Sequence, residues 1–222
     1  MVETKIIILD QQEIVYKIHY KRIKNCYLRV EKGEVVIRCS PLFPQSEIEK
    51  LIRNHQEEIL EQIKGYVPKY NYQEDGYAYL FNQKYQIVLK DMNIKKCAIH
   101  DRQIYVYSKN IQATIEMFLK QELMNYLKER IDFYLSTSFH HVFPEIQIKK
   151  MKRRWGACFY QKNRVCFNLV LAHIDYALID YVIVHELCHF LEANHSKAFY
   201  HEIEKRMPDY KERERLLKDV GI

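Results

Sequence analysis

Glycine and proline are scarce in this chain of 222 residues, which contains only five of each. Their scarcity excludes collagen-like repeats and argues against low-complexity linkers. The six cysteines form no C-x-x-C pair, so we do not expect a thiolate-rich metal site and interpret them as small buried hydrophobic residues in a reducing compartment. The most apolar stretch, residues 176–191, is interrupted by polar side chains and is too polar to span a bilayer (Asp180, His185, Glu186 and His189).

The first residues also lack the features of a secretory signal. Glu3 stands before a short apolar run, and no small-residue cleavage site follows it. A cytoplasmic location is therefore the expectation. The overall composition, 48% apolar and 29% charged, is that of an ordinary globular protein rather than a disordered or membrane-embedded one.

Positive charge is unevenly distributed along the chain, whose formal net charge is +6. Basic runs occur at residues 21–24 and 149–154. They are interpreted either as solvated strand faces or as a surface for an anionic partner, such as nucleic acid or a phosphate-bearing substrate. Because the second run is close in sequence to the candidate active site, the anionic partner stays open.

Hydrophobic periodicity divides the chain into a strand-rich region with one helix, residues 1–109, and a helix-rich region, residues 110–222. The one helix of the first region is expected from Pro44 to about Lys64. The second region is expected to contain a long helix, a strand near 146–150, a hairpin, and helices starting near Asp175 and Ser196, followed by a charged surface helix. No internal repeat is visible in the sequence. These patterns predict an α+β fold.

One motif carries most of the chemistry: His185-Glu186-x-x-His189, within the apolar stretch. Histidines four residues apart lie on one face of a helix, where both rings can reach one zinc ion at about 2.0–2.1 Å. Glu186 follows the first histidine and can hold a zinc-bound water without binding the metal itself. The hydrophobic surroundings strengthen this interpretation, because an unpaired buried carboxylate is costly.

A catalytic zinc site commonly takes three protein ligands and one water. His195 is the favoured third ligand, because Ala193-Asn194 is expected to end the helix and let the chain turn back to the metal. His201 and Glu202, in the next helix, are the rival candidates. Glu192 fits poorly, since it lies on the same helix only three residues after His189.

Several segments together resemble the YgjP-like metallopeptidases, which are related to SprT and the WLM domains among the gluzincin-like zincins (Arg154-Trp155-Gly156-Ala157-Cys158, Asn168, residues 181–189, Asn194-His195-Ser196 and residues 207–210). The resemblance is sharp over about residues 146–210 and looser in the first half. It implies a small zincin-like core with a sheet, an active-site helix and a third histidine at the Asn-His-Ser step. This chain has Ala157 where the group usually has serine, and Glu192 stands where the metzincins need glycine.

Four residues are candidates for substrate binding: Arg154, Trp155, Asn168 and Tyr200. The hairpin that starts at Trp155-Gly156 could form the upper edge of the cleft, where an extended peptide adds as a further strand. Alternatively, Trp155 only packs and Gly156 only serves turn geometry. Arg154 and Tyr200 are candidates for stabilising the oxyanion, although the sequence does not position them.

The resulting hypothesis is a zinc-dependent hydrolase, a metallopeptidase in which Glu186 is the general base. One alternative is a nucleotide pyrophosphohydrolase that grips phosphates with its second basic run (Lys149, Lys152, Arg153 and Arg154). The other is a nucleic-acid-associated binding module with structural zinc. This second alternative is weaker, because structural zinc sites usually fill all four positions with protein ligands, often thiolates, and only Cys188 is close.

Overall fold

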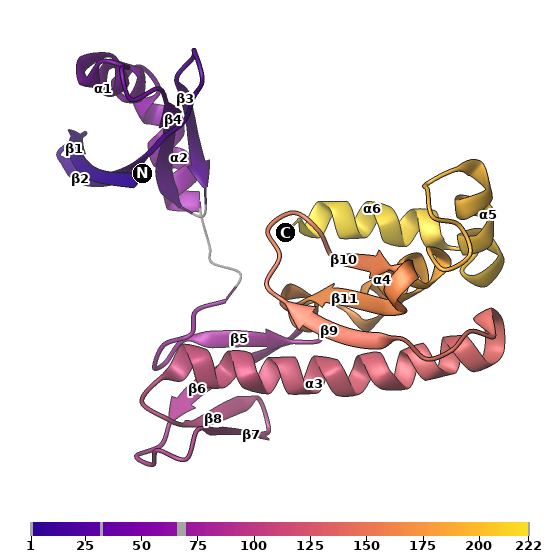
Figure 1. The fold of residues 1–222 in the computed structure, drawn as a ribbon. Coiled ribbons are helices and arrows are strands. Elements are labelled where there is room, and N and C mark those ends of the chain that lie inside the picture. The colour runs from indigo at the N-terminus through magenta and orange to yellow at the C-terminus, as the bar shows by residue number, and fades with distance from the viewer. Residues whose placement is uncertain (1, 32, 66–69, 222) are drawn as a thin grey trace. The chain divides into compact units, whose positions relative to one another are not determined.

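The computed structural model describes residues 2–31, 33–65 and 70–221, and it confirms the predicted α+β class (Figure 1). It divides into two compact units, Met1–Pro68 and Lys69–Ile222. The sequence placed the boundary near residue 109 instead. The division falls earlier because the strands between residues 77 and 107 contribute side chains to the same hydrophobic core as the helices that follow them.

The first unit consists of a four-stranded sheet and two helices. The strand order is β1-β2-β4-β3, with antiparallel outer pairs and a parallel pair between β2 and β4. Alternate strand residues and one face of α1 form an apolar core around Ile18, Ile37 and Ile48. The elements are β1 (Val2–Leu9), β2 (Gln12–Tyr20), β3 (Tyr27–Glu31), β4 (Glu34–Cys39), α1 (Gln45–Asn54) and α2 (Gln56–Gly65).

The single helix expected from Pro44 to Lys64 is interrupted. At His55 the backbone leaves the helical region, with φ −113° and ψ 21°, and its N–H donates to the Ile52 carbonyl. Neither glycine nor proline marks the break, so hydrophobic spacing alone predicted one helix. Ile52 and Ile59 are both buried in the same core, so the apolar face continues across the interruption.

The second unit begins with a four-stranded sheet of the order β5-β6-β8-β7. A two-residue turn joins β5 to β6, and Phe81 and Asn82 both have positive φ (49° and 66°), as a type I′ turn requires. Ile87 and Ile104 of this sheet are fully buried in one cluster with Leu119 of α3. The elements are β5 (Tyr77–Leu80), β6 (Gln83–Leu89), β7 (Lys96–His100), β8 (Gln103–Tyr107) and α3 (Ile111–Tyr134).

A three-stranded sheet and three helices complete the second unit. The sheet order is β10-β11-β9, so β10 lies at an edge (Figure 1). Helix α4 contacts α3, α5, α6 and β10, which explains its almost continuous apolar sequence. None of the described helices is long and apolar enough to cross a membrane. The elements are β9 (Glu145–Lys149), β10 (Gly156–Phe159), β11 (Arg164–Asn168), α4 (Tyr176–Cys188), α5 (Lys197–Arg206) and α6 (Tyr210–Val220).

A buried ion pair fixes α4 against α3. Asp180 of α4 is 9% exposed, and its Oδ2 accepts a hydrogen bond from Arg130 Nη2 at 2.6 Å. The hydroxyls of Tyr126 and Tyr134 donate to the same carboxylate at 2.8 and 3.1 Å. The charge that interrupts the apolar run is therefore fully partnered, as a buried carboxylate must be.

Candidate functional site

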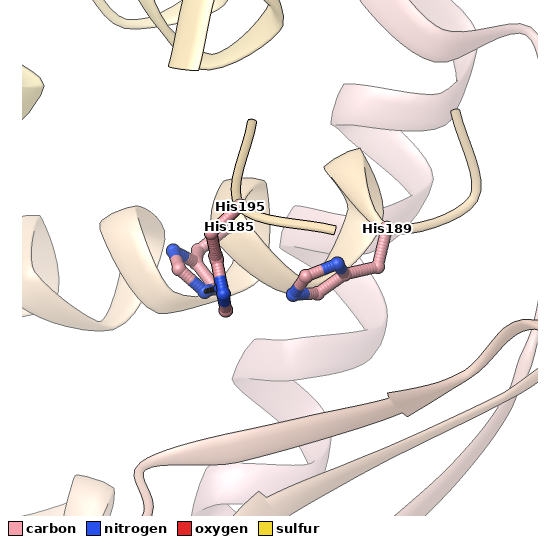
Figure 2. Close-up of side chains that lie close together, drawn as sticks. All are labelled: His185, His189 and His195. Atoms are coloured by element: carbon pink, nitrogen blue, oxygen red, sulfur yellow. Dashed lines mark hydrogen bonds between the residues drawn. The ribbon is translucent and has the colours of Figure 1, made fainter. Parts of the chain in front are cut away.

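Three histidines meet where α4 ends. His185 occupies the last turn of α4, and His189 is its C-cap, at φ −67° and ψ −13°. The helix was expected to continue to Ala193, but it stops at Cys188, and the following turn brings His195 back to the other two rings (Figure 2). One ligand nitrogen of each histidine can be chosen so that all three lie within 4.8 Å of one another.

Two residues at the start of α5, the N-cap Ser196 and Phe199, support this arrangement of the histidines. Ser196 caps α5 as the sequence predicted, accepting a hydrogen bond from the Phe199 N–H at 3.3 Å. The buried Phe199 ring lies 5.0, 4.6 and 4.8 Å from the rings of His185, His189 and His195. The sequence analysis missed Phe199, although its spacing of four from Ile203 marks the buried face of α5.

The contacts of the three rings indicate which of their nitrogens can bind a metal ion. Because a carbonyl can only accept, His189 Nδ1 must donate its hydrogen to the Glu192 carbonyl at 3.2 Å, which leaves Nε2 with a free lone pair. His185 Nε2 and His195 Nε2 face each other at 3.0 Å. Burial and the two neighbouring rings lower the pKa of His185 to about 3, so the ring is neutral and can act as a ligand. The donor set therefore fits a zinc ion.

The rival third ligands do not join the cluster in the described part of the chain. Glu202 accepts hydrogen bonds from Lys205 Nζ at 2.7 Å and Arg206 Nη1 at 2.6 Å, and these cations lower its pKa to about 2. His201 is exposed on α5. Glu192 contributes its backbone carbonyl to His189. Among the candidates weighed from sequence, the geometry favours His195.

Glu186 lies buried beside the histidines, with 6% of its surface exposed. Burial raises the pKa of its carboxyl to about 8, against the opposing effects of a hydrogen bond from the Cys158 backbone and of the Arg154 charge. A carboxyl group with a pKa near neutrality can both accept and return a proton.

Gly156 has a different role from the turn geometry considered in the sequence. A Cβ atom at this position would lie 2.5 Å from Glu186 Oε1 and 2.7 Å from its Cγ. Any side chain would therefore displace the carboxylate. Glycine allows the first residue of β10 to lie directly against Glu186.

The histidines and Glu186 line a cleft of about 580 Å³. Arg154 and Trp155, predicted to bind substrate, are part of its wall. Helix α6, expected as a charged surface helix, also contributes to the wall through Glu214, Leu217 and Lys218. The signal for its partial burial was the apolar pair Tyr210 and Leu217, both buried on one side of the helix. The other lining residues are Gly156, Ala157, Cys158, Tyr160, Tyr181, Val182 and Ala193.

Two of the predicted substrate-binding residues lie elsewhere. Asn168 is 2% exposed, and its side-chain NH₂ donates to the carbonyls of Met151 and Arg154 at 2.8 and 2.9 Å. Asn168 is not part of the described cleft lining. Its side-chain amide instead forms the hydrogen bonds that the backbone carbonyls of the preceding loop need. Tyr200 is absent from the described cleft lining, and its ring lies 6.3 Å from the His195 ring and 6.2 Å from the Tyr210 ring.

Three comparisons with known proteins place the chain among other sequences and structures. A sequence model of the family described as "YgjP-like, metallopeptidase domain" matches residues 24–220. No curated protein matches the chain. Two crystal structures are similar to part of it. The metallopeptidase zymogen of Pyrococcus abyssi abylysin is 17% identical, with a TM-score of 0.39 and coverage of 42% of this chain and 94% of its own. That of Methanocaldococcus jannaschii jannalysin is 24% identical, with a TM-score of 0.38 and coverage of 42% and 96%.

The family match spans most of the chain, from before β3 to the last turn of α6, and it includes every residue of the histidine cluster. It confirms the resemblance found in the sequence and implies a peptidase that uses a metal ion. The alternatives drawn from the basic runs, a phosphoanhydride hydrolase and a nucleic-acid module, find no support in it. The chain belongs to the YgjP-like metallopeptidase family.

Proposed function

We propose that this protein is a zinc-dependent peptidase in which His185, His189 and His195 hold the ion and Glu186 is the general base. The observation that carries the proposal is the meeting of three imidazoles and one buried carboxyl at the floor of one cleft. Three nitrogen ligands that leave a fourth position open are typical of catalytic rather than structural zinc. When bound, zinc would supply a Lewis acid that polarises the peptide carbonyl and acidifies a water molecule.

The chain's own residues supply the proton transfers. The Glu186 carboxylate takes the proton of the attacking water and passes it to the leaving amine. A hydrogen bond from the Cys158 backbone holds this carboxylate, and the lack of a side chain at Gly156 leaves room for it. Because Glu186 is buried, its interactions with the reacting groups are screened less by solvent than they would be at the surface.

An extended substrate would bind along β10. This strand is at the edge of its sheet and also lines the cleft, so its outer backbone groups, apart from the Cys158 group that is bonded to Glu186, would be available to a peptide. Addition of a peptide as a further strand would place its backbone beside Gly156 and Glu186. Backbone pairing of this kind gives affinity with little dependence on sequence.

The test combines zinc content with hydrolysis of a panel of unstructured peptides. His185→Ala is expected to lose both zinc and activity, whereas Glu186→Gln should keep zinc and lose hydrolysis by about 10²–10⁴-fold. A fully active Gln variant would contradict the general-base assignment.

His195→Ala tests the third ligand, with His201→Ala as the matched control. His201 is an exposed histidine on the adjoining helix, and its removal should change neither quantity. Zinc retained by His195→Ala at the wild-type level would contradict His195 as a ligand. Absence of zinc from the wild-type protein after incubation with the metal would overturn the proposal.

A further inference from the structure

One of the cations that line the cleft has no ion-pair partner among the described residues. The lining residues include two carboxylates, Glu186 and Glu214, and two cations, Arg154 and Lys218. Lys218 Nζ is paired with Glu214 at 3.2 Å on the same face of α6. Glu186 is buried against the Cys158 backbone. Arg154 is exposed and forms no ion pair with any described carboxylate, although its charge acts on the buried Glu186 carboxyl, so its guanidinium donors are available to a substrate group.

Two neighbouring cations lie in the same loop, although neither is part of the described cleft lining. Lys152 and Arg153 are exposed in the same loop and have no ion pair in the described part of the chain. Lys150, by contrast, is neutralised by Glu116, with Nζ 2.6 Å from Oε1. Lys149 also has no ion pair among the described residues, but it belongs to β9, so the unpaired cations of the loop itself are the three residues that directly precede Trp155.

Hydrogen bonds from Asn168 hold both ends of the loop that carries these cations. Asn168 Oδ1 accepts from the Met151 N–H at 3.2 Å, and its Nδ2 donates to the Met151 and Arg154 carbonyls. The Asn168 N–H donates to the Trp155 carbonyl at 2.8 Å. These bonds fix both ends of residues 151–155. A cation on a fixed backbone is a better recognition element than one on a mobile loop, because less entropy is lost on binding.

Arg154 also lies in a position from which it could bind a substrate side chain, in the cleft wall just before β10. It lies two residues before Gly156, which contacts the Glu186 carboxyl, and β10 begins at that glycine. A peptide paired with β10 would therefore pass Arg154 immediately beside the reacting bond. The guanidinium suits carboxylate recognition because its planar donors can form two parallel hydrogen bonds.

We propose that Arg154, with Lys152 and Arg153 beside it, selects peptide substrates that carry an acidic side chain next to the scissile bond. This inference rests on the proposed peptidase function and adds a substrate class to it. Asn168 acts as a positioning residue, because it holds the loop and does not touch the substrate.

The test uses the zinc-loaded full-length protein and three peptides that differ at one position beside the cleavage point, occupied by Glu, Gln or Lys. Exposed charge pairs are worth about 0.2–1 kcal/mol, so kcat/KM should be up to about fivefold higher for Glu than for Gln, and lower again for Lys. Arg154→Glu should invert the order of the Glu and Lys peptides. Lys128→Glu, an equal charge reversal at an exposed position of α3, should preserve it.

A binding measurement separates this inference from the peptidase proposal. Fluorescence anisotropy of the same peptides with Glu186→Gln and with Glu186→Gln/Arg154→Glu needs no turnover. Tighter binding of the Glu peptide, weakened by salt and lost with Arg154, supports acidic selection even if the wild type cleaves none of the three. Equal binding and equal cleavage of all three peptides would overturn it. So would Arg154-dependent binding of single-stranded DNA without any preference among the peptides.

Discussion

The two four-stranded sheets of this protein share one topology but belong to different cores. In each, two antiparallel hairpins are joined by a central parallel pair, β2 with β4 and β6 with β8. Matching positions carry matching residues: Ile37 lies between Ile18 and Leu28 in the first sheet, and Ile104 lies between Ile87 and Ile99 in the second. One sheet closes a core with α1 and α2, whereas the other contributes to the core of the second unit, which carries the three clustered histidines.

The cores differ in polarity. Every buried polar or charged side chain among the described residues lies in the second unit: Ser108, Thr114, Asn168, Asp180 and Glu186. Burying a polar group costs free energy unless it is hydrogen-bonded, so such groups indicate either a structural network or a functional site. Asp180 belongs to a structural network, Asn168 holds a loop, and Glu186 faces the cleft. The difference teaches that one topology can serve as a plain hydrophobic scaffold or as support for chemistry.

The largest effect on stability is expected from Asp180→Ala. Removal of the carboxylate leaves Arg130 and two tyrosine hydroxyls without their common partner, which should cost about 3–5 kcal/mol of unfolding free energy. Glu34→Ala is the counterpart in the first unit, where the pair with Lys17 is 54% and 38% exposed, and it should cost less than about 1 kcal/mol. Urea unfolding of both variants measures the contrast, which an equal loss would contradict.

Substitution of the two matching isoleucines should destabilise the protein by similar amounts but should affect zinc binding differently. Ile37→Ala and Ile104→Ala each create a cavity at a fully buried position, at a cost of about 2–5 kcal/mol. We expect Ile104→Ala to lower the temperature at which zinc is released, and Ile37→Ala to leave zinc content and peptide hydrolysis unchanged. Calorimetry together with zinc analysis makes this comparison. A loss of zinc from Ile37→Ala would show that the units do not act separately.

Gly156→Ala should impair catalysis more than folding. The added methyl group must displace the Glu186 carboxylate, and a shift of about 1 Å in a catalytic group can cost about 100-fold. Zinc content should stay at the wild-type level. Gly76→Ala is the steric control, because its methyl group would meet the Asn71 carbonyl far from the cleft in sequence. The control should lose stability but keep kcat/KM per folded molecule.

The last prediction is a pH dependence of stability in the metal-free protein. Burial raises the Glu186 pKa from 4.5 to about 8, so the folded state holds a proton that the unfolded state has released. The contribution of Glu186 to stability is then fully present below pH 4.5 and is lost as pH rises to about 8, by at most about 1.4 kcal/mol per pH unit. Glu186→Gln lacks this slope, so the stability difference between the two proteins should change across this interval. Parallel curves would contradict the raised pKa.

Local patterns predicted much of the fold and part of the site. Strand and helix positions followed from periodicity, Ser196 from its capping chemistry, and the His185–His189 pair from helical spacing. Features that depend on contacts between distant segments were harder to predict from the sequence. The sequence assigned no role in the cleft to α6 and placed Asn168 in substrate binding, because neither helix packing nor a side chain's backbone partners can be read from a neighbouring motif.

The amino-acid sequence by itself determined the α+β class, the order of the elements and the residue types available for metal binding, because these depend on periodicity and on spacing along one helix. Only the tertiary structure decided that the chain divides at residue 68 and that Gly156 contacts Glu186. It also decided that the Phe199 ring packs against the rings of three histidines. These features join residues far apart in sequence, and their geometry is set by which cores form and how closely they pack.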